Sequence, residues 1–129
     1  RVKISEQYKD ALLVSLHMNS FGEEKYSGLQ VYFSKNVALS QKLASNIQNE
    51  VRERVQPNNT RGIKATEDLY VLTNNPNAAV LIECGFISSP AEVRKLVSPD
   101  YQEKLARGIA DGVRSYHLSI MRNQTRLKK

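Results

Sequence analysis

Two residues that can carry chemistry stand at the ends of apolar runs typical of buried strands. His17 lies near the end of the run 11–18, and Glu83 directly follows the run 79–82. In open α/β sheets, functional sites form outside the carboxyl ends of the strands. A carboxylate buried there without a partner charge is costly, so its position indicates a metal, a bound cation or an acid–base role.

Both residues also have a purely structural interpretation. Glu83 can turn to solvent or pair with Arg61 or Lys64, both of which lie in the polar segment 60–68. A single His at a strand end is often a hydrogen-bonded core residue with no role as a metal ligand or catalyst. The residue types and their spacing leave these alternatives open.

The apolar pattern predicts the elements that would position the two side chains. Uninterrupted apolar runs and β-branched or aromatic segments predict four strands. These strands are expected at 11–18, 29–33, 69–72 and 79–82. An apolar residue at every fourth position from Leu39 to Val55 predicts a helix, with Asn36 as its N-cap.

Helix-start signals define the remainder of the chain. Residues 2–8 look like the last turns of an amphipathic helix without a capping residue, whereas Ser89 and Ser98 each precede a Pro. In the last helix Gly108 and Gly112 share a face and are expected to let the helix lie close to a sheet. The order of elements predicts a three-layer α/β domain, a mixed sheet flanked by helices.

Composition limits the class of protein. The chain has 129 residues, with 19 Lys and Arg against 13 Asp and Glu, so its formal net charge is +6. This length favours one domain, expected over 1–121, followed by a frayed basic tail over 122–129. The single Cys excludes an internal disulfide, and no apolar stretch approaches the roughly 18 residues of a transmembrane helix. The positive charge fits either a polyanionic partner or a solvated surface.

Several separate motifs fall in the order and spacing of a known family. They are Ser15-Leu16-His17-Met18-Asn19-Ser20, Ser27-Gly28-Leu29-Gln30-Val31-Tyr32, Arg61-Gly62-Ile63-Lys64, and Ala79-Val80-Leu81-Ile82-Glu83-Cys84-Gly85-Phe86. From Arg1 to about Tyr116 the sequence resembles the zinc-dependent N-acetylmuramoyl-L-alanine amidases, which cut the bacterial cell wall.

The resemblance implies a fold, a substrate and residue roles. The substrate is peptidoglycan, in the cell wall or spore cortex outside the cytoplasm. The bond cut is the amide between muramic acid and the L-alanine of the stem peptide. In the family, Zn²⁺ is held by two His and one Glu. By motif match His17 is the last of these three ligands, and Glu83 is the catalytic acid and base. Asn19, Arg61 and Lys64 are expected to contact or orient the substrate.

The sequence departs from the family pattern at its beginning. The family's first zinc His and its ligand Glu precede the motif that contains His17, and nothing upstream of that motif matches them here. His117 matches no family motif. The chain is therefore expected to be the C-terminal part of the catalytic domain, without the first strands and inactive alone. Its expected partner is the missing N-terminal part, as a separate peptide, or an activating protein.

Two other classes of function remain to be compared with the amidase. A module with this fold can bind wall or a protein partner without catalysis. A basic nucleic-acid binder is the third hypothesis, but the sequence has no helix-turn-helix pattern, aromatic RNA-binding motif or basic helix face. Within the amidase family, Gln30 and the stretch 58–61 resemble the spore-cortex, germination-type enzymes.

Overall fold

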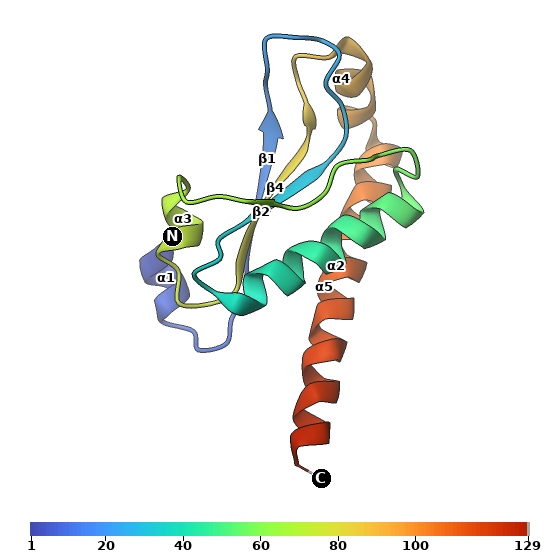
Figure 1. Cartoon of the computed structure of the whole chain (residues 1–129). Helices are drawn as coiled ribbons and strands as arrows, with labels where there is room; N and C mark the ends of the chain where they lie inside the picture. The colour runs from blue at the N-terminus through green and yellow to red at the C-terminus, as the bar shows by residue number, and fades with distance from the viewer. Residues whose placement is uncertain (129) are drawn as a thin grey trace.

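The computed structural model describes residues 1–128 and contains a mixed sheet of four strands. The strands are β1 (Leu13–Asn19), β2 (Gln30–Phe33), β3 (Lys64–Ala65) and β4 (Ala79–Phe86). Their spatial order is β1-β4-β2-β3, so the central β4 lies between β1 and β2 (Figure 1). β4 is parallel to β1 and antiparallel to β2, and β3 is parallel to β2.

Five helices surround this sheet in the described part of the chain (Figure 1). They are α1 (Val2–Glu6), α2 (Ala38–Arg54), α3 (Tyr70–Thr73), α4 (Pro90–Leu96) and α5 (Pro99–Leu127). α1 begins without a side-chain cap, as the sequence predicts. Ser89 and Ser98 both cap as predicted, because each side chain accepts a hydrogen bond from the backbone N–H three residues later.

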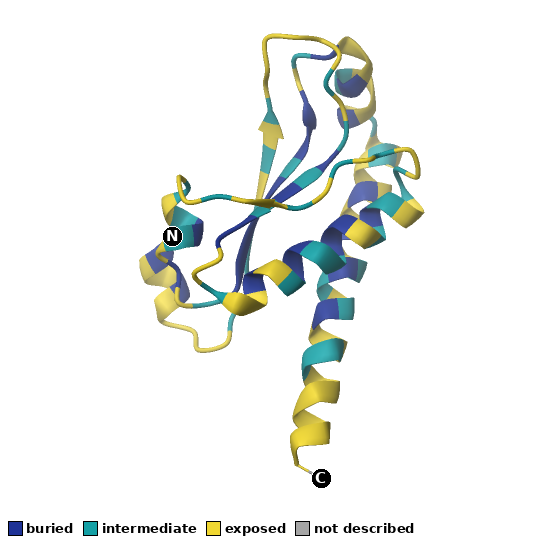
Figure 2. Ribbon diagram, viewed as in Figure 1, coloured by how far each residue is buried: buried dark blue, intermediate teal, exposed yellow. Residues whose placement is uncertain are grey.

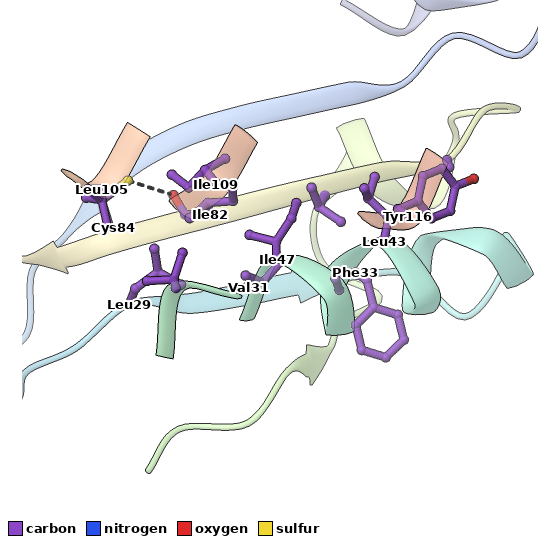
Figure 3. Packing of buried hydrophobic residues seen from close by; sticks show 14 of the residues in the cluster. Leu29, Val31, Phe33, Leu43, Ile47, Ile82, Cys84, Leu105, Ile109 and Tyr116 are labelled. Carbon is purple, nitrogen blue, oxygen red and sulfur yellow. Dashed lines mark hydrogen bonds between the residues drawn. The ribbon is translucent and has the colours of Figure 1, made fainter. Parts of the chain in front are cut away.

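The main hydrophobic core lies between one face of the sheet and the pair α2 and α5 (Figure 3). Val31 of β2 and Ile82 of β4 are fully buried there, against Ile47 of α2 and Ile109 of α5. α3 covers part of the opposite face, where Leu72 packs on Ala79 and Leu81. This arrangement confirms the predicted three-layer α/β architecture.

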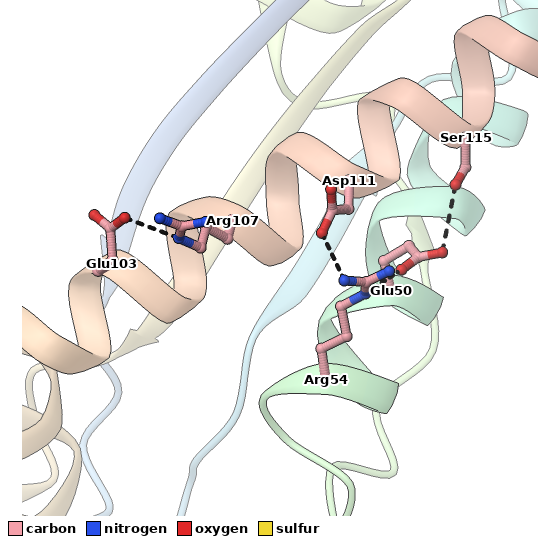
Figure 4. A network of polar contacts seen from close by, with 6 residues as sticks. All are labelled: Glu50, Arg54, Glu103, Arg107, Asp111 and Ser115. Atoms are coloured by element: carbon pink, nitrogen blue, oxygen red, sulfur yellow. Dashed lines mark hydrogen bonds and ion pairs between the residues drawn. The ribbon is translucent and has the colours of Figure 1, made fainter.

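α2 and α5 pack closely because glycine removes side chains from the contact. A Cβ atom on Gly112 would lie 2.4 Å from the Cα of Ile47, and one on Gly108 would lie 3.2 Å from Val51. The two glycines therefore face α2, and the expectation that they face a sheet is wrong. Outside this contact, Arg54 of α2 forms an ion pair with Asp111 of α5 at 2.9 Å (Figure 4).

The segment expected to be a strand at 69–72 instead forms the single helical turn α3. Leu72 is fully buried, whereas Tyr70 is 71% exposed, so the expectation that Tyr70 is a core residue is also wrong. The turn is held by its own hydrogen bonds: the Thr73 hydroxyl donates to the carbonyl of Leu69. A run of four apolar residues does not distinguish a short strand from a buried helical turn.

Two helix termini differ from the sequence expectation. The N-cap of α2 is Val37, with no side-chain hydrogen bond, and the Asn36 amide instead donates to the carbonyl of Thr73. α5 continues through Leu127, so residues 122–127, which include Arg122 and Arg126, form exposed helical turns and not a frayed tail (Figure 2). Lys129 lies outside the described residues.

β1 lies at the edge of the sheet and is less buried than its apolar sequence predicts. Leu16 is 60% exposed and Met18 is 50% exposed, although Val14 packs against the main core. The expectation of a strand buried on both faces holds for β4 and not for β1. Within the described part of the chain, no helix combines the length and apolar character needed to cross a membrane.

Candidate active site

His17 and Glu83 are direct neighbours across the parallel pair β1 and β4. The strand register pairs Leu16 with Ile82 and His17 with Glu83. Paired residues of adjacent strands project to the same face of a sheet. Both lie in the second half of their strands, so they meet at the carboxyl edge of this parallel pair. The predicted proximity of the two residues is confirmed.

His17 and Glu83 form a row of neighbouring side chains on one face of the sheet, and this row continues onto β2. The sequence alone did not identify a functional residue there. The antiparallel register pairs Gln30 with Glu83 and Tyr32 with Leu81, so Gln30 and Tyr32 share the face of Glu83. Burial and the neighbouring carboxylate of Glu83 raise the pKa of the Tyr32 phenol, and Arg61 lowers it. The alternation of side chains along the segment 29–33 could have indicated this face once the strand pairing was known.

Glu83 has an electrostatic environment suited to proton transfer. One of its carboxylate oxygens, Oε2, is buried and accepts no hydrogen bond from the described residues. Burial raises the pKa of Glu83, and the nearby His17 opposes this by lowering it. No ion pair between Glu83 and Arg61 or Lys64 occurs in the described part of the chain, so the structural alternative of a paired carboxylate is not what the fold contains.

The His17 side chain forms a hydrogen bond with a residue of its own strand, Ser15. The Oγ of Ser15 lies 2.9 Å from the Nε2 of His17, and both residues are half-buried. Since residues two apart on a strand point to the same face, this hydrogen bond runs along the face that also carries Glu83. The ring of His17 therefore has one nitrogen engaged with Ser15.

Arg61 is fixed beside this row by several hydrogen bonds. Its Nε donates to the carbonyl of Ser27 at 2.7 Å, and its Nη1 lies 3.4 Å from the Oε1 of Gln30. The backbone N–H of Arg61 donates to Asn59, and its carbonyl accepts from Arg52. The position of this guanidinium is therefore set by both the backbone and the side chain.

Asn19 and Lys64 have looser connections to the site. The Asn19 side chain accepts a hydrogen bond from the N–H of Ser20 at 2.8 Å, which is a local turn contact. Lys64 is exposed on β3, with its Nζ 5.7 Å from the centre of the Tyr32 ring. Thus Lys64 lies near Tyr32, on the face that carries Glu83, whereas Asn19 is the last residue of β1.

A large cavity lies beside the row and does not include His17 or Glu83. Its volume is about 620 Å³, and Arg61, Glu92, Lys95 and Tyr101 are among its lining residues. Glu92 is buried, with its Oε1 accepting the N–H of Gly28 at 2.6 Å. Arg61 is thus the residue that connects this cavity with the face of Glu83.

The described residues do not complete a metal site. They hold no group of three or more His, Cys, Asp or Glu side chains that could bind a metal ion. A catalytic zinc site uses three protein ligands, and the row offers one His beside one carboxylate. Cys84 faces the main core, where burial raises the pKa of its thiol to about 11, so it is not poised as a ligand or nucleophile.

A His beside a half-buried carboxylate, at the carboxyl ends of neighbouring strands, is an arrangement of groups that acid–base hydrolysis uses. Comparison with known proteins identifies the family. Residues 1–115 match the family described as N-acetylmuramoyl-L-alanine amidase. Since this match spans most of the 129 residues, the chain belongs to that amidase family.

Individual relatives agree with this assignment. The chain is 35% identical over 116 residues to the germination-specific N-acetylmuramoyl-L-alanine amidase of Bacillus subtilis. It also resembles the CwlD amidase of Clostridioides difficile, solved in complex with the GerS lipoprotein, with a TM-score of 0.86 and 37% identity. A third match is the AmiC2 amidase of Nostoc punctiforme, with a TM-score of 0.82 and 27% identity.

The matches cover most of this chain and only part of each relative. The match to the Bacillus subtilis amidase includes 90% of this chain and 48% of that relative. In the comparison with the CwlD structure, 92% of this chain aligns with 59% of the CwlD chain. In the comparison with AmiC2, 91% of this chain aligns with 63% of the AmiC2 chain. The chain therefore spans about half to three fifths of the length of these three relatives.

Proposed function

We propose that this chain is the part of a peptidoglycan amidase that carries its proton-transfer residue. The reaction is hydrolysis of the amide between N-acetylmuramic acid and the L-alanine of the stem peptide. The observation that carries this proposal is the register of His17 beside Glu83 in a chain that matches the amidase family over residues 1–115. The domain assignment is 1–121 for this catalytic part, with a basic segment over 122–129.

Glu83 is the general base and then the general acid. It takes a proton from the attacking water and delivers that proton to the leaving amine, so the charge on the carboxylate is restored. Its half-buried position and the unpaired Oε2 support this role, since a carboxylate paired with a cation would be a weaker base. General acid–base catalysis contributes about 10²–10⁴-fold to a rate.

His17 is the one zinc ligand that this chain supplies. When bound in a catalytic site, zinc lowers the pKa of its water to about 7 and polarises the scissile carbonyl. Because the described residues hold no complete ligand set, the other two ligands come from polypeptide outside these 129 residues. The match takes in only 48% of the germination amidase, so the unmatched part of that relative leaves room for them.

The side chains around the row bind and orient the substrate. Arg61 is the best placed, because its guanidinium is fixed next to Gln30, the strand neighbour of Glu83. A planar guanidinium matches the carboxylates of a stem peptide. Lys64 adds a second positive charge on the same side. Asn19, at the end of β1, orients the substrate.

The names of the relatives support a place of action and a set of partners for this proposal. These relatives are named as germination and cell wall amidases, so we assign this chain to the cell wall or spore cortex, outside the cytoplasm. The partners are peptidoglycan and the remaining part of the catalytic domain. An activating protein is a further partner, an assignment supported by the CwlD amidase, which was solved in complex with the GerS lipoprotein.

The function is tested by supplying the remaining part of the domain. Purified peptidoglycan is incubated with this chain alone, and with this chain joined to the N-terminal portion of the amidase domain. We expect only the joined protein to release stem peptides with a new amino-terminal L-alanine, detected by mass spectrometry, and only it to retain zinc. A joined protein that sediments with wall but releases no peptides would favour a non-catalytic wall-binding module instead.

A further inference from the structure

The cavity beside the row contains a buried carboxylate with one oxygen unengaged. Glu92 of α4 lines this cavity of about 620 Å³ and is only 4% exposed. Its Oε1 accepts the N–H of Gly28 at 2.6 Å, whereas its Oε2 has no hydrogen-bond or ion-pair partner among the described residues. A buried carboxylate normally has a cation or several donors around it. The second oxygen of Glu92 therefore lacks a partner that a ligand in the cavity would supply.

The position of the Glu92 side chain is set by the loop before β2. Ser89 caps the N–H of Glu92, but the carboxylate does not return the bond as in a capping box, and it reaches across to Gly28 instead. Gly28 has a φ of +91°, and a Cβ there would lie 2.8 Å from the side chain of Asn59. Glycine is therefore required at this position, and the N–H that holds Oε1 is fixed.

Hydrogen-bond donors and positive charges line the same cavity. The hydroxyl of Tyr101 accepts a hydrogen bond from the Nε2 of Gln56 at 2.6 Å, and its own proton has no acceptor among the described residues. Burial raises the pKa of the Tyr101 phenol, the hydrogen bond from Gln56 lowers it, and the charge of Glu92 raises it, so the phenol keeps this proton. Lys95 and Arg61 add two positive charges to the lining.

We propose that this cavity is a second substrate-binding site, which takes an amino-acid unit that carries both an ammonium and a carboxylate group. The ammonium binds at the Oε2 of Glu92, and the carboxylate binds at Lys95 and the hydroxyl of Tyr101. A ligand with negative charge only would face Glu92, and one with positive charge only would face Lys95 and Arg61. A ligand with both charges pairs each group of the cavity with its opposite.

This inference deepens the proposed function and rests on it for the assignment of that unit to the stem peptide. Arg61 lines the cavity, and its Nη1 also lies 3.4 Å from the Oε1 of Gln30, the strand neighbour of Glu83. A peptide whose L-alanine end lies at Glu83 therefore runs past this guanidinium to reach the cavity. The cavity would bind a residue further along the same peptide.

The first test measures binding of short peptides to this chain by isothermal titration calorimetry. The probe is N-acetyl-L-Ala-L-Ala-L-Lys, which has one ammonium and one carboxylate. The two control peptides are the same sequence acetylated at the Lys Nζ and the same sequence amidated at its carboxyl end. We expect each control peptide to bind about 10- to 100-fold more weakly, the cost of losing a charge-assisted hydrogen bond. Equal affinities for the probe and the Nζ-acetylated peptide, or no binding of the probe, would overturn the proposal.

Substitutions in the cavity assign each charge of the probe to a residue. Glu92→Gln keeps an acceptor for the N–H of Gly28 and removes the charge, so it should preserve the fold, checked by circular dichroism, and abolish the preference for the free ammonium. Lys95→Gln, at an exposed position, should reduce the preference for the free carboxylate. Glu6→Gln is the matched control, because Glu6 is exposed on α1, away from the cavity (Figure 1). A Glu92→Gln protein that still prefers the free ammonium would overturn the proposal.

The binding data and the activity of the complete domain separate this inference from the proposed function. If the probe binds as expected and the complete domain releases no stem peptides from peptidoglycan, the proposed function is wrong, and so is the assignment of the bound unit to the stem peptide. If the complete domain releases stem peptides and neither it nor this chain binds the probe, the second binding site alone is wrong.

Discussion

The guanidinium carbon of Arg61 lies 4.8 Å from the centre of the Phe86 ring. Phe86 ends β4, three residues after Glu83, and is itself buried. A cation over an aromatic face at this distance is attracted to the ring, and the planar guanidinium can also stack on it. The strand that carries Glu83 therefore also carries the platform on which the proposed substrate-binding Arg61 rests.

Replacing Arg61 with Lys should impair binding of the substrate more than the chemical step. Lys keeps the charge but loses the fork that contacts Ser27 and Gln30. Loss of a charge-assisted hydrogen bond of about 1.5–3 kcal/mol corresponds to roughly a 10- to 100-fold increase in KM. The measurement is the rate of muropeptide release by the complete domain over a range of substrate concentrations.

The control for this variant is Arg107→Lys. Arg107 is exposed on α5 and pairs with Glu103, so its replacement should leave KM unchanged. If Arg61→Lys lowers kcat with KM unaltered, Arg61 acts on the transition state and the proposed binding role is wrong.

Glu83→Gln in the complete domain should abolish most hydrolysis while zinc stays bound. The amide has the shape of the carboxylate but cannot take a proton from water, so kcat should fall by about 10²–10⁴-fold. Glu103→Gln, on the exposed face of α5, is the matched control. Muropeptide release and zinc content are measured on the same samples. A Glu83→Gln variant that loses its zinc would make Glu83 a ligand, and near-normal release would remove it from the mechanism.

His17→Ala should also abolish activity, but unlike Glu83→Gln it should lose the zinc. The complete domain should lose zinc on dialysis, from about one equivalent to a small fraction, and lose activity with it, because two ligands do not make a catalytic site. His117→Ala should retain both, since His117 is exposed on α5. Stoichiometric zinc in the dialysed His17→Ala protein would exclude His17 from the ligand set.

The sequence predicts the central part of the site well because each signal there is local. Apolar runs that end in His17 and Glu83 identify the two strands, and the carboxyl-end rule for sheets brings the two residues together. The residues next to Glu83 on the β2 side depend on pairing between segments that are distant in the sequence. Gln30 reaches Glu83 only through the antiparallel β2–β4 ladder, and no local pattern specifies that partner.

The errors in the fold have a related cause. The segment 69–72 has strand-forming residues, yet tertiary contacts of Leu72 with Ala79 and Leu81 stabilise a helical turn. Gly108 and Gly112 do mark a close approach, as their spacing indicates, but the sequence does not say whether a sheet or a helix approaches them. The exposure of β1 likewise depends on what lies beside it, which the apolar run itself does not reveal.

The contact at Gly112 predicts a stability change of unusual sign. In an exposed helix Gly→Ala stabilises by about 1 kcal/mol. Here the new Cβ would lie 2.4 Å from the Cα of Ile47, a backbone atom that cannot move aside without shifting α2. We therefore expect Gly112→Ala to lower the free energy of unfolding by roughly 1–3 kcal/mol, as overpacked cores do. Urea denaturation followed by circular dichroism measures it.

Gly22→Ala is the matched control for this substitution. A Cβ at Gly22 would meet no atom within 4 Å, so the unfolding free energy should change little. Equal or greater stability of Gly112→Ala than of wild type would show that the α2–α5 contact is looser than the structure has it.

Cys84, the one thiol of the chain, reports directly on the packing beneath Glu83. It is 4% exposed, and burial raises the pKa of its thiol to about 11, from 9.0. At pH 8 the folded protein should therefore react with iodoacetamide far more slowly than the urea-unfolded chain, which mass spectrometry follows as one added label. Rapid labelling of the native protein at this pH would place the thiol outside the core.

The same raised pKa of Cys84 predicts a dependence of stability on pH. Since the folded state favours the neutral thiol, its contribution to stability is present below about pH 9 and is lost as the pH rises towards about 11. Cys84→Ala should lack this contribution, so the difference in unfolding free energy between wild type and Cys84→Ala should shrink across that interval. Urea denaturation of both proteins at a series of pH values measures it. A difference that stays constant across the interval would mean that the thiol ionises equally well in the folded and unfolded chains, and that Cys84 is not sealed within the core.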